Sequence, residues 1–161
     1  MVSVAIFDYG AGNIFSLKNS LEQAGASVDV ITSFDKPNVY SGLLLPGVGN
    51  FDPAIKSINE NSKTKFQDFV KQNTPVLGIC LGMEMFFEKS EEGIEKGFNV
   101  IDGEIVVLPS TVKVPHMGWN NLEIKRPGVI LEGVKDDSWV YFVHSYRAQP
   151  KFDDVITAES D

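Results

Sequence analysis

The first half of the chain alternates apolar runs with segments of helical periodicity. Four apolar-rich runs occupy 2–7, 27–32, 42–45 and 75–79, and the first of them is almost continuous. Strands that are apolar on both faces are typical of a parallel sheet, because the helices that connect parallel strands cover both of its faces. We therefore predict an α/β fold with a doubly wound, mostly parallel sheet and helices on both faces.

Helices are predicted between these runs from the spacing of their apolar residues. The segment 14–24 places Ile14, Leu17 and Leu21 on one helical face, and Gly25 ends it. A second helical stretch covers 55–70, with a break near 59–62. A third helix is predicted for 81–89.

The second half of the chain has a different residue pattern. Glycine and proline residues separate short runs rich in β-branched residues at 99–101, 104–108, 121–124 and 139–143. Such runs are typical of an antiparallel hairpin region added to the parallel core. The chain then ends in a strand-like run from 154 that no helix follows. We expect a single domain over residues 1–161 whose C-terminal part is missing.

Charge and hydropathy exclude several classes of partner. The formal net charge is −8, which disfavours binding to nucleic acid. No apolar stretch approaches the roughly 20 residues that span a bilayer, and the first residues lack the basic flank of a signal peptide. We expect a cytoplasmic protein with no nucleic-acid or membrane partner.

Cys80 is the only cysteine and lies in a distinctive setting. The sequence Gly78-Ile79-Cys80-Leu81-Gly82 follows a predicted buried strand and precedes a predicted helix, which is the layout of a nucleophile elbow. A helix N-terminus lowers the pKa of a thiol, and the Leu81 N–H would point toward a tetrahedral oxyanion. Cys80 is therefore the candidate catalytic nucleophile; the alternative is a buried cysteine in a tight turn.

A second glycine-rich turn leaves the carboxyl end of the predicted strand 42–45. It reads Pro46-Gly47-Val48-Gly49, and ligands of open α/β sheets bind along this edge. Val48 or Gly49 could supply the second oxyanion N–H, because glycines allow backbone amides to turn into a site. The alternative interpretation is an ordinary Pro-Gly turn.

Two histidines are available as a base for the thiol. His116 lies in 115–120, which we predict to be a loop, and His144 follows the strand 139–143. Neither is placed at a second strand end with a carboxylate behind it. A structural or substrate-contacting role is expected for both, although either could in principle be the base.

Five runs together resemble a known family. They are DYGAGN at 8–13, LPGVG at 45–49, GICLGM at 78–83, PHMGWN at 115–120 and YFVHSY at 141–146. Their order is similar to that in the glutaminase subunit of imidazole glycerol phosphate synthase, a class I (triad) glutamine amidotransferase. The elbow is shared by all class I members, whereas the other four runs are more specific to this subunit.

The resemblance implies a reaction, a partner and a set of site residues. Cys80 would attack the carboxamide carbon of L-glutamine, forming a thioester and releasing ammonia into a (β/α)8-barrel cyclase subunit of histidine biosynthesis. No cofactor or metal is implied. The oxyanion donors would be Leu81 with Val48 or Gly49. The implied substrate-binding residues are Gly47, Gly49, Glu84, His144, Ser145 and Tyr146, and the implied interface residues are Asn13, Trp119 and Tyr141.

The sequence departs from the family pattern in two places. Family members complete the triad with a C-terminal His-Pro-Glu run, which does not occur in these 161 residues. The chain as given is therefore expected to lack its base and to be inactive. Glu84 stands where family members more often carry Gln, and a carboxylate near a thiolate would raise the thiol pKa.

Two other functions remain open at the level of sequence. The first is the glutaminase of another synthase, of the anthranilate or GMP type, which shares only the elbow. The second is a non-catalytic cysteine sensor or binding module on the same sheet.

Overall fold

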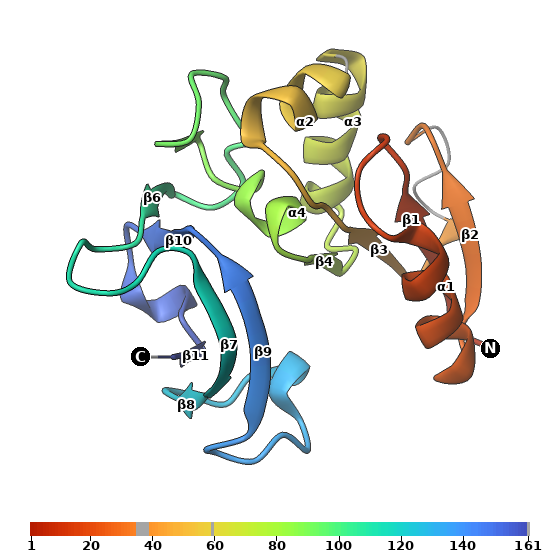
Figure 1. Cartoon of the computed structure of the whole chain (residues 1–161). Coiled ribbons are helices and arrows are strands. Elements are labelled where there is room, and N and C mark those ends of the chain that lie inside the picture. Colours follow the sequence, from red (N-terminus) through yellow and green to blue (C-terminus); the bar gives the residue numbers. More distant parts are fainter. Residues whose placement is uncertain (35–38, 59, 161) are drawn as a thin grey trace.

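The computed structural model describes residues 1–34, 39–58 and 60–160. Its central feature is a four-stranded parallel sheet in the order β2-β1-β3-β4. The strands are β1 (Ser3–Phe7), β2 (Ser27–Ile31), β3 (Gly42–Leu45) and β4 (Val76–Gly78). All four coincide with the predicted apolar runs, so the parallel sheet is confirmed (Figure 1).

Helices pack on both faces of this sheet. They are α1 (Ile14–Gln23), α2 (Phe51–Ser57), α3 (Glu60–Lys71) and α4 (Leu81–Glu84). The apolar side of α1 packs on one face, against a cluster of Ile6, Val28 and Leu44, whereas α2, α3 and α4 contribute to the core on the other. The sheet is thus doubly wound. The predicted break in the second helical stretch falls between α2 and α3, and Asn59 lies outside the described residues.

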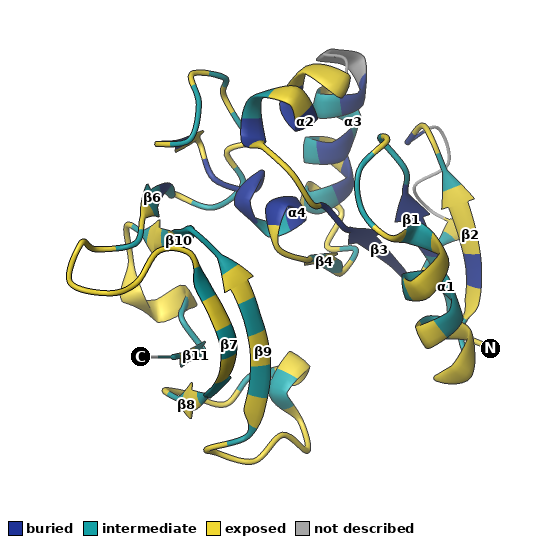
Figure 2. Ribbon diagram, in the orientation of Figure 1, coloured by how far each residue is buried: buried dark blue, intermediate teal, exposed yellow. Residues whose placement is uncertain are grey.

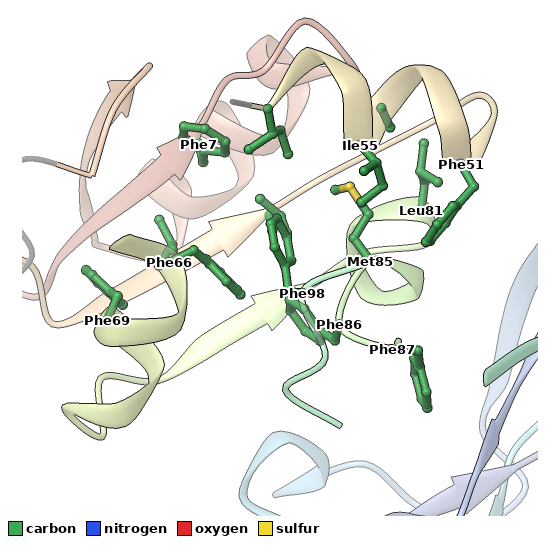
Figure 3. Close-up of a cluster of buried hydrophobic side chains, with 14 of the residues drawn as sticks. Phe7, Phe51, Ile55, Phe66, Phe69, Leu81, Met85, Phe86, Phe87 and Phe98 are labelled. Carbon is green, nitrogen blue, oxygen red and sulfur yellow. The ribbon is translucent and has the colours of Figure 1, made fainter. Parts of the chain in front are cut away.

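Aromatic side chains fill the larger of the two cores. Phe66 lies near its centre, with its ring centroid 4.3 Å from that of Phe98 and 5.9 Å from that of Phe86 (Figure 3). Phe66 and Phe98 have no exposed surface. Each buried phenylalanine contributes roughly 1.5–3 kcal/mol of transfer free energy, so this cluster fixes α3 and the segment around Phe98 against the sheet.

The second half of the chain contains short strands in three further sheets. Antiparallel pairing joins β6 to β10, β7 to β9 and β8 to β11, and β5 adds to β6 in parallel. The antiparallel region is therefore confirmed. The elements are β5 (Lys89–Ser90), β6 (Gly103–Val107), β7 (His116–Asn121), β8 (Glu123–Ile124), β9 (Trp139–His144), β10 (Tyr146–Pro150) and β11 (Ala158–Glu159), with 3₁₀ turns η2 (Val129–Leu131) and η3 (Asp153–Val155).

Four local predictions in this half were wrong. Residues 115–120 are not a loop, because His116 to Asn121 pair with β9 along their whole length. The helix predicted for 81–89 ends at Glu84, since the Phe98 N–H bonds the Met85 carbonyl and the Val100 N–H bonds that of Phe86. Those bonds also hold 99–101 as irregular backbone instead of a strand. The final strand begins at Ala158, not at 154.

Burial differs sharply between the two halves (Figure 2). Buried residues concentrate in β1, β3, α2, α3 and α4, whereas β7 and β9 alternate between intermediate and exposed positions. No helix of the described residues is long and apolar enough to cross a membrane.

Candidate active site

Cys80 occupies a strained turn between β4 and α4. Its backbone has φ 53° and ψ −118°, a region that non-glycine residues rarely adopt. Neither flanking glycine has room for a side chain. A Cβ on Gly78 would lie 2.6 Å from the Met83 Cα, and one on Gly82 would overlap the Leu45 carbonyl oxygen. Strain of this kind persists only where surrounding packing enforces it. The elbow predicted from the sequence is confirmed, and Cys80 is exposed at its tip.

The glycine-rich loop 46–49 lies directly against this elbow. A Cβ on Gly47 would be 2.9 Å from the Gly82 nitrogen and 2.9 Å from the Leu81 Cβ, and it would overlap the Tyr9 hydroxyl. Only glycine allows so close an approach of the two backbones. The loop after β3 and the nucleophile after β4 therefore meet at the carboxyl edge of the sheet, as predicted.

Two hydrogen bonds anchor the loop at its two ends. The Tyr9 hydroxyl donates to the Pro46 carbonyl at 2.6 Å. At the other end, the Phe51 N–H donates to a Glu92 carboxylate oxygen at 2.7 Å, which caps the start of α2. Between these anchors, no described residue accepts a hydrogen bond from the N–H of Val48 or Gly49. Their amides are thus available to a ligand, in a loop whose Gly47 packs against the elbow.

The electrostatics of the thiol differ from the expectation. Partial enclosure raises the pKa of Cys80, the Leu81 N–H lowers it by hydrogen bonding the sulfur, and the carboxylates of Glu84 and Glu92 raise it further. The net shift is upward. The predicted lowering was wrong, because α4 has only four residues and the enclosure and nearby carboxylates outweigh its terminus. The resting thiol is neutral and needs a base.

The charges of Glu84 and Glu92 act on both Cys80 and Tyr146. Glu84 is buried, at 8% exposure, and burial together with the Glu92 charge raises its pKa to about 7. The pKa of Tyr146, on β10, is raised by burial and by the charges of Glu92, Glu84 and Glu91. The described residues contain no group of three or more His, Cys, Asp or Glu suited to hold a metal ion.

Sequence reasoning missed Tyr9 and Glu92. Tyr9 carried a usable signal, since it follows the first strand at the edge where ligands bind. Glu92 carried none, because its contact with Phe51 spans 41 residues and depends on the fold of the segment after β5.

The two histidines bind each other and not the nucleophile. His144 Nδ1 donates to the Tyr146 carbonyl at 2.8 Å, so the Nε2 of neutral His144 accepts from His116 Nδ1 at 3.0 Å. Both ring nitrogens of His144 are thereby occupied, and no hydrogen bond joins the Cys80 thiol to a basic group among the described residues. The bond joins β7 to β9, while a structural or substrate-contacting role for the two histidines, and substrate contact by Ser145, stay predictions.

The predicted interface residues lie on the surface. Asn13 is exposed and caps α1, accepting the Ser16 N–H at 3.1 Å. Trp119 and Tyr141 are opposite each other on β7 and β9, exposed at 65% and 57%, with ring centroids 5.6 Å apart edge to face. We define the aromatic face as the exposed side of this strand pair; it comprises Met117, Trp119, Trp139, Tyr141 and Val143.

The Tyr9 anchor gives a testable prediction. Tyr9→Phe removes only the hydroxyl that bonds the Pro46 carbonyl, and we expect a loss of about 1 kcal/mol in the free energy of unfolding. Urea denaturation measures it. Tyr40→Phe is the matched control, since its hydroxyl bonds Asp29 at an exposed site, and it should cost under about 0.5 kcal/mol. Equal effects of the two substitutions would contradict the anchor.

A family comparison identifies what kind of site this is. The family model described as glutamine amidotransferase class-I matches residues 5–161. Relatives named imidazole glycerol phosphate synthase subunit HisH match nearly the whole chain. The one from Cyanophora paradoxa is 40% identical, covering 98% of this chain and 75% of its own. The chain belongs to the HisH family of class I glutamine amidotransferases.

Other HisH relatives agree. That of Aquifex aeolicus is 41% identical, covering 97% of this chain and 77% of its own, and that of Archaeoglobus fulgidus is 42% identical, covering 98% and 79%. The resemblance first seen in five short runs is therefore confirmed.

Solved structures show the same fold at low identity. A structure of PurLQS from Thermotoga maritima has a TM-score of 0.73 at 15% identity, covering 99% of this HisH-family chain and 74% of its own. A putative GMP synthase component from Thermoplasma acidophilum has a TM-score of 0.71 at 18% identity, covering 99% and 73%. These two likenesses support the α/β fold class.

Proposed function

We propose that this HisH-family chain hydrolyses L-glutamine at Cys80 and passes the ammonia to a (β/α)8-barrel cyclase subunit that makes imidazole glycerol phosphate in histidine biosynthesis. The observation that carries the proposal is the exposed Cys80 thiol on a strained elbow, beside backbone amides that have no acceptor in the described part of the chain. The site and the HisH relatives support the same reaction. A cytoplasmic location and a single amidotransferase domain belong to the proposal.

The reaction follows from the geometry around the thiol. A base removes the thiol proton, and Sγ attacks the carboxamide carbon of glutamine, moving an electron pair onto its oxygen. The N–H groups of Leu81 and of Val48 or Gly49 hold this oxyanion. The C–N bond then breaks, ammonia leaves with the transferred proton, and water hydrolyses the thioester to glutamate and free thiol. We assign the base to the His-Glu pair that the family resemblance implies.

Substrate recognition is proposed for the groups that surround Cys80. Gly47 packs against the elbow backbone and Gly49 has open space where a side chain would stand, so both let a ligand approach the main chain. Tyr146 and Glu84 are assigned to the same pocket. Carboxylates without a cationic partner favour a ligand that carries an ammonium group. His144 and Ser145 complete the proposed pocket through their position beside Tyr146.

A redox-sensor function has less support. Sensor thiols have a low pKa and react as thiolates, whereas burial and two carboxylates raise the pKa of Cys80.

Glutamate release from glutamine tests the proposed glutaminase function directly. The full-length protein with its cyclase subunit should release glutamate, and a mixture that releases none would contradict the proposed function.

The aromatic face and Asn13 are the proposed contacts with the cyclase subunit. Exposed aromatic side chains on a regular strand pair resemble the anchors that dominate protein interfaces. We expect Trp119→Ala to weaken association with the cyclase subunit by about 30-fold, or about 2 kcal/mol. Titration calorimetry measures it. Phe152→Ala removes another exposed aromatic ring outside this face and should leave the affinity unchanged; equal weakening by both variants would contradict the assignment.

A further inference from the structure

Glu84 is a buried acid in the same turn as the nucleophile. It is the last residue of α4, and its N–H donates to the Cys80 carbonyl at 3.0 Å. Its side chain is enclosed, with 8% of its surface exposed. Nothing in the oxyanion chemistry described above uses this carboxyl group.

The carboxylate has no partner that would offset its charge. Within the described residues, Glu84 makes no ion pair and no side-chain hydrogen bond. The titratable groups that interact electrostatically with it are instead acidic. They come from the end of β1, from the elbow, from the segment after β5, and from β10. They are Tyr9, Cys80, Glu92 and Tyr146. The charge of Glu91 also acts on Tyr146.

A hydrogen bond from the backbone holds Glu92 in place. Its carboxylate accepts the Phe51 N–H at the start of α2, which holds it in the site. Burial and this fixed neighbour raise the pKa of Glu84 to about 7. Glu84 therefore loses its proton around neutral pH, and a charged Glu84 opposes formation of the Cys80 thiolate.

We propose that Glu84 controls the nucleophile through its charge: ionised Glu84 keeps the free Cys80 thiol protonated, and neutralising Glu84 makes Cys80 more reactive. Glu84 does not touch the substrate carbon in this proposal. It acts only through Cys80, by deciding whether the thiol keeps its proton. The inference concerns the nucleophile of the proposed function, but it can be tested without glutamine hydrolysis, so either can fail alone.

The experiment measures alkylation of Cys80 by iodoacetamide, a neutral reagent, as a function of pH. Cys80 is the only cysteine of the 161-residue chain, so the reaction reports one site. At about pH 8, Glu84→Gln should react at least about threefold faster than the parent chain, equivalent to about half a pKa unit of the thiol. Below about pH 6 the two rates should converge, because Glu84 is then neutral in the parent chain as well.

Two further variants separate charge from structure. Glu84→Met places an uncharged apolar chain of similar length at the position, and it should reproduce the faster reaction at high pH if it folds. Glu88→Gln removes an exposed carboxylate that pairs with Lys96 at 3.9 Å, and it should follow the parent curve. Unchanged rates in Glu84→Gln, an equal acceleration at every pH, or the same acceleration in Glu88→Gln would overturn the proposal.

Discussion

Cys80→Ala in the full-length protein should lower glutamine hydrolysis in the presence of the cyclase subunit by at least about 1,000-fold. The substitution removes the only sulfur nucleophile at the elbow, while the backbone amides and the loop 46–49 remain. Glutamate release under saturating glutamine measures the effect. Because alanine is smaller than cysteine at an exposed position, the fold itself should not change.

Cys80→Ser serves as the matched variant for this prediction. Serine is close to cysteine in size and carries a hydroxyl in place of the thiol, but a hydroxyl is far less acidic than a thiol, so we expect a comparable loss. Added ammonia should still support the cyclase reaction in both variants, which shows that the partner is intact. Residual hydrolysis near the parent rate in either variant would remove Cys80 from the mechanism.

Gly82→Ala should have the largest effect on stability. A Cβ there would overlap the Leu45 carbonyl oxygen and lie 2.6 Å from its carbon, both of them backbone atoms of a buried strand. The strand and the elbow must separate to admit it, and we expect a loss of about 3 kcal/mol or more in the free energy of unfolding. Urea denaturation of the 161-residue chain measures it.

Gly42→Ala is the control for Gly82→Ala. It adds the same methyl group in β3, where the nearest atoms are the Pro75 oxygen at 3.4 Å and a Val4 carbon at 3.8 Å, which are ordinary contacts. Its expected cost is under about 1 kcal/mol. If both substitutions cost the same, the close approach of Gly82 to β3 does not determine the packing of the elbow.

The parallel half of the fold could be predicted because its signals are local. Apolar runs such as 42–45 and the glycine pair around Cys80 encode strands and a tight turn within a few residues of each other. The order of the motifs then places the loop after β3 beside the elbow after β4, since both leave the same edge of a parallel sheet.

The second half could not be predicted as well because its structure depends on distant partners. Residues 116–121 contain two asparagines and a glycine, and they form a strand only because β9 pairs with them in full register. The same limit applies to the site. The anchor from Glu92 and the upward shift of the Cys80 pKa both arise from groups brought together by folding.

Mass spectrometry of a trapped adduct tests the central claim most directly. The full-length protein with its cyclase subunit is incubated with a glutamine analogue whose side-chain amide is replaced by a chloroketone, and the modified peptide is sequenced. Attack by a thiolate displaces chloride and leaves a stable thioether on sulfur. We predict one adduct, on Cys80, whose formation is prevented by excess glutamine; an adduct on another residue, or one insensitive to glutamine, would contradict Cys80 as the glutaminase nucleophile.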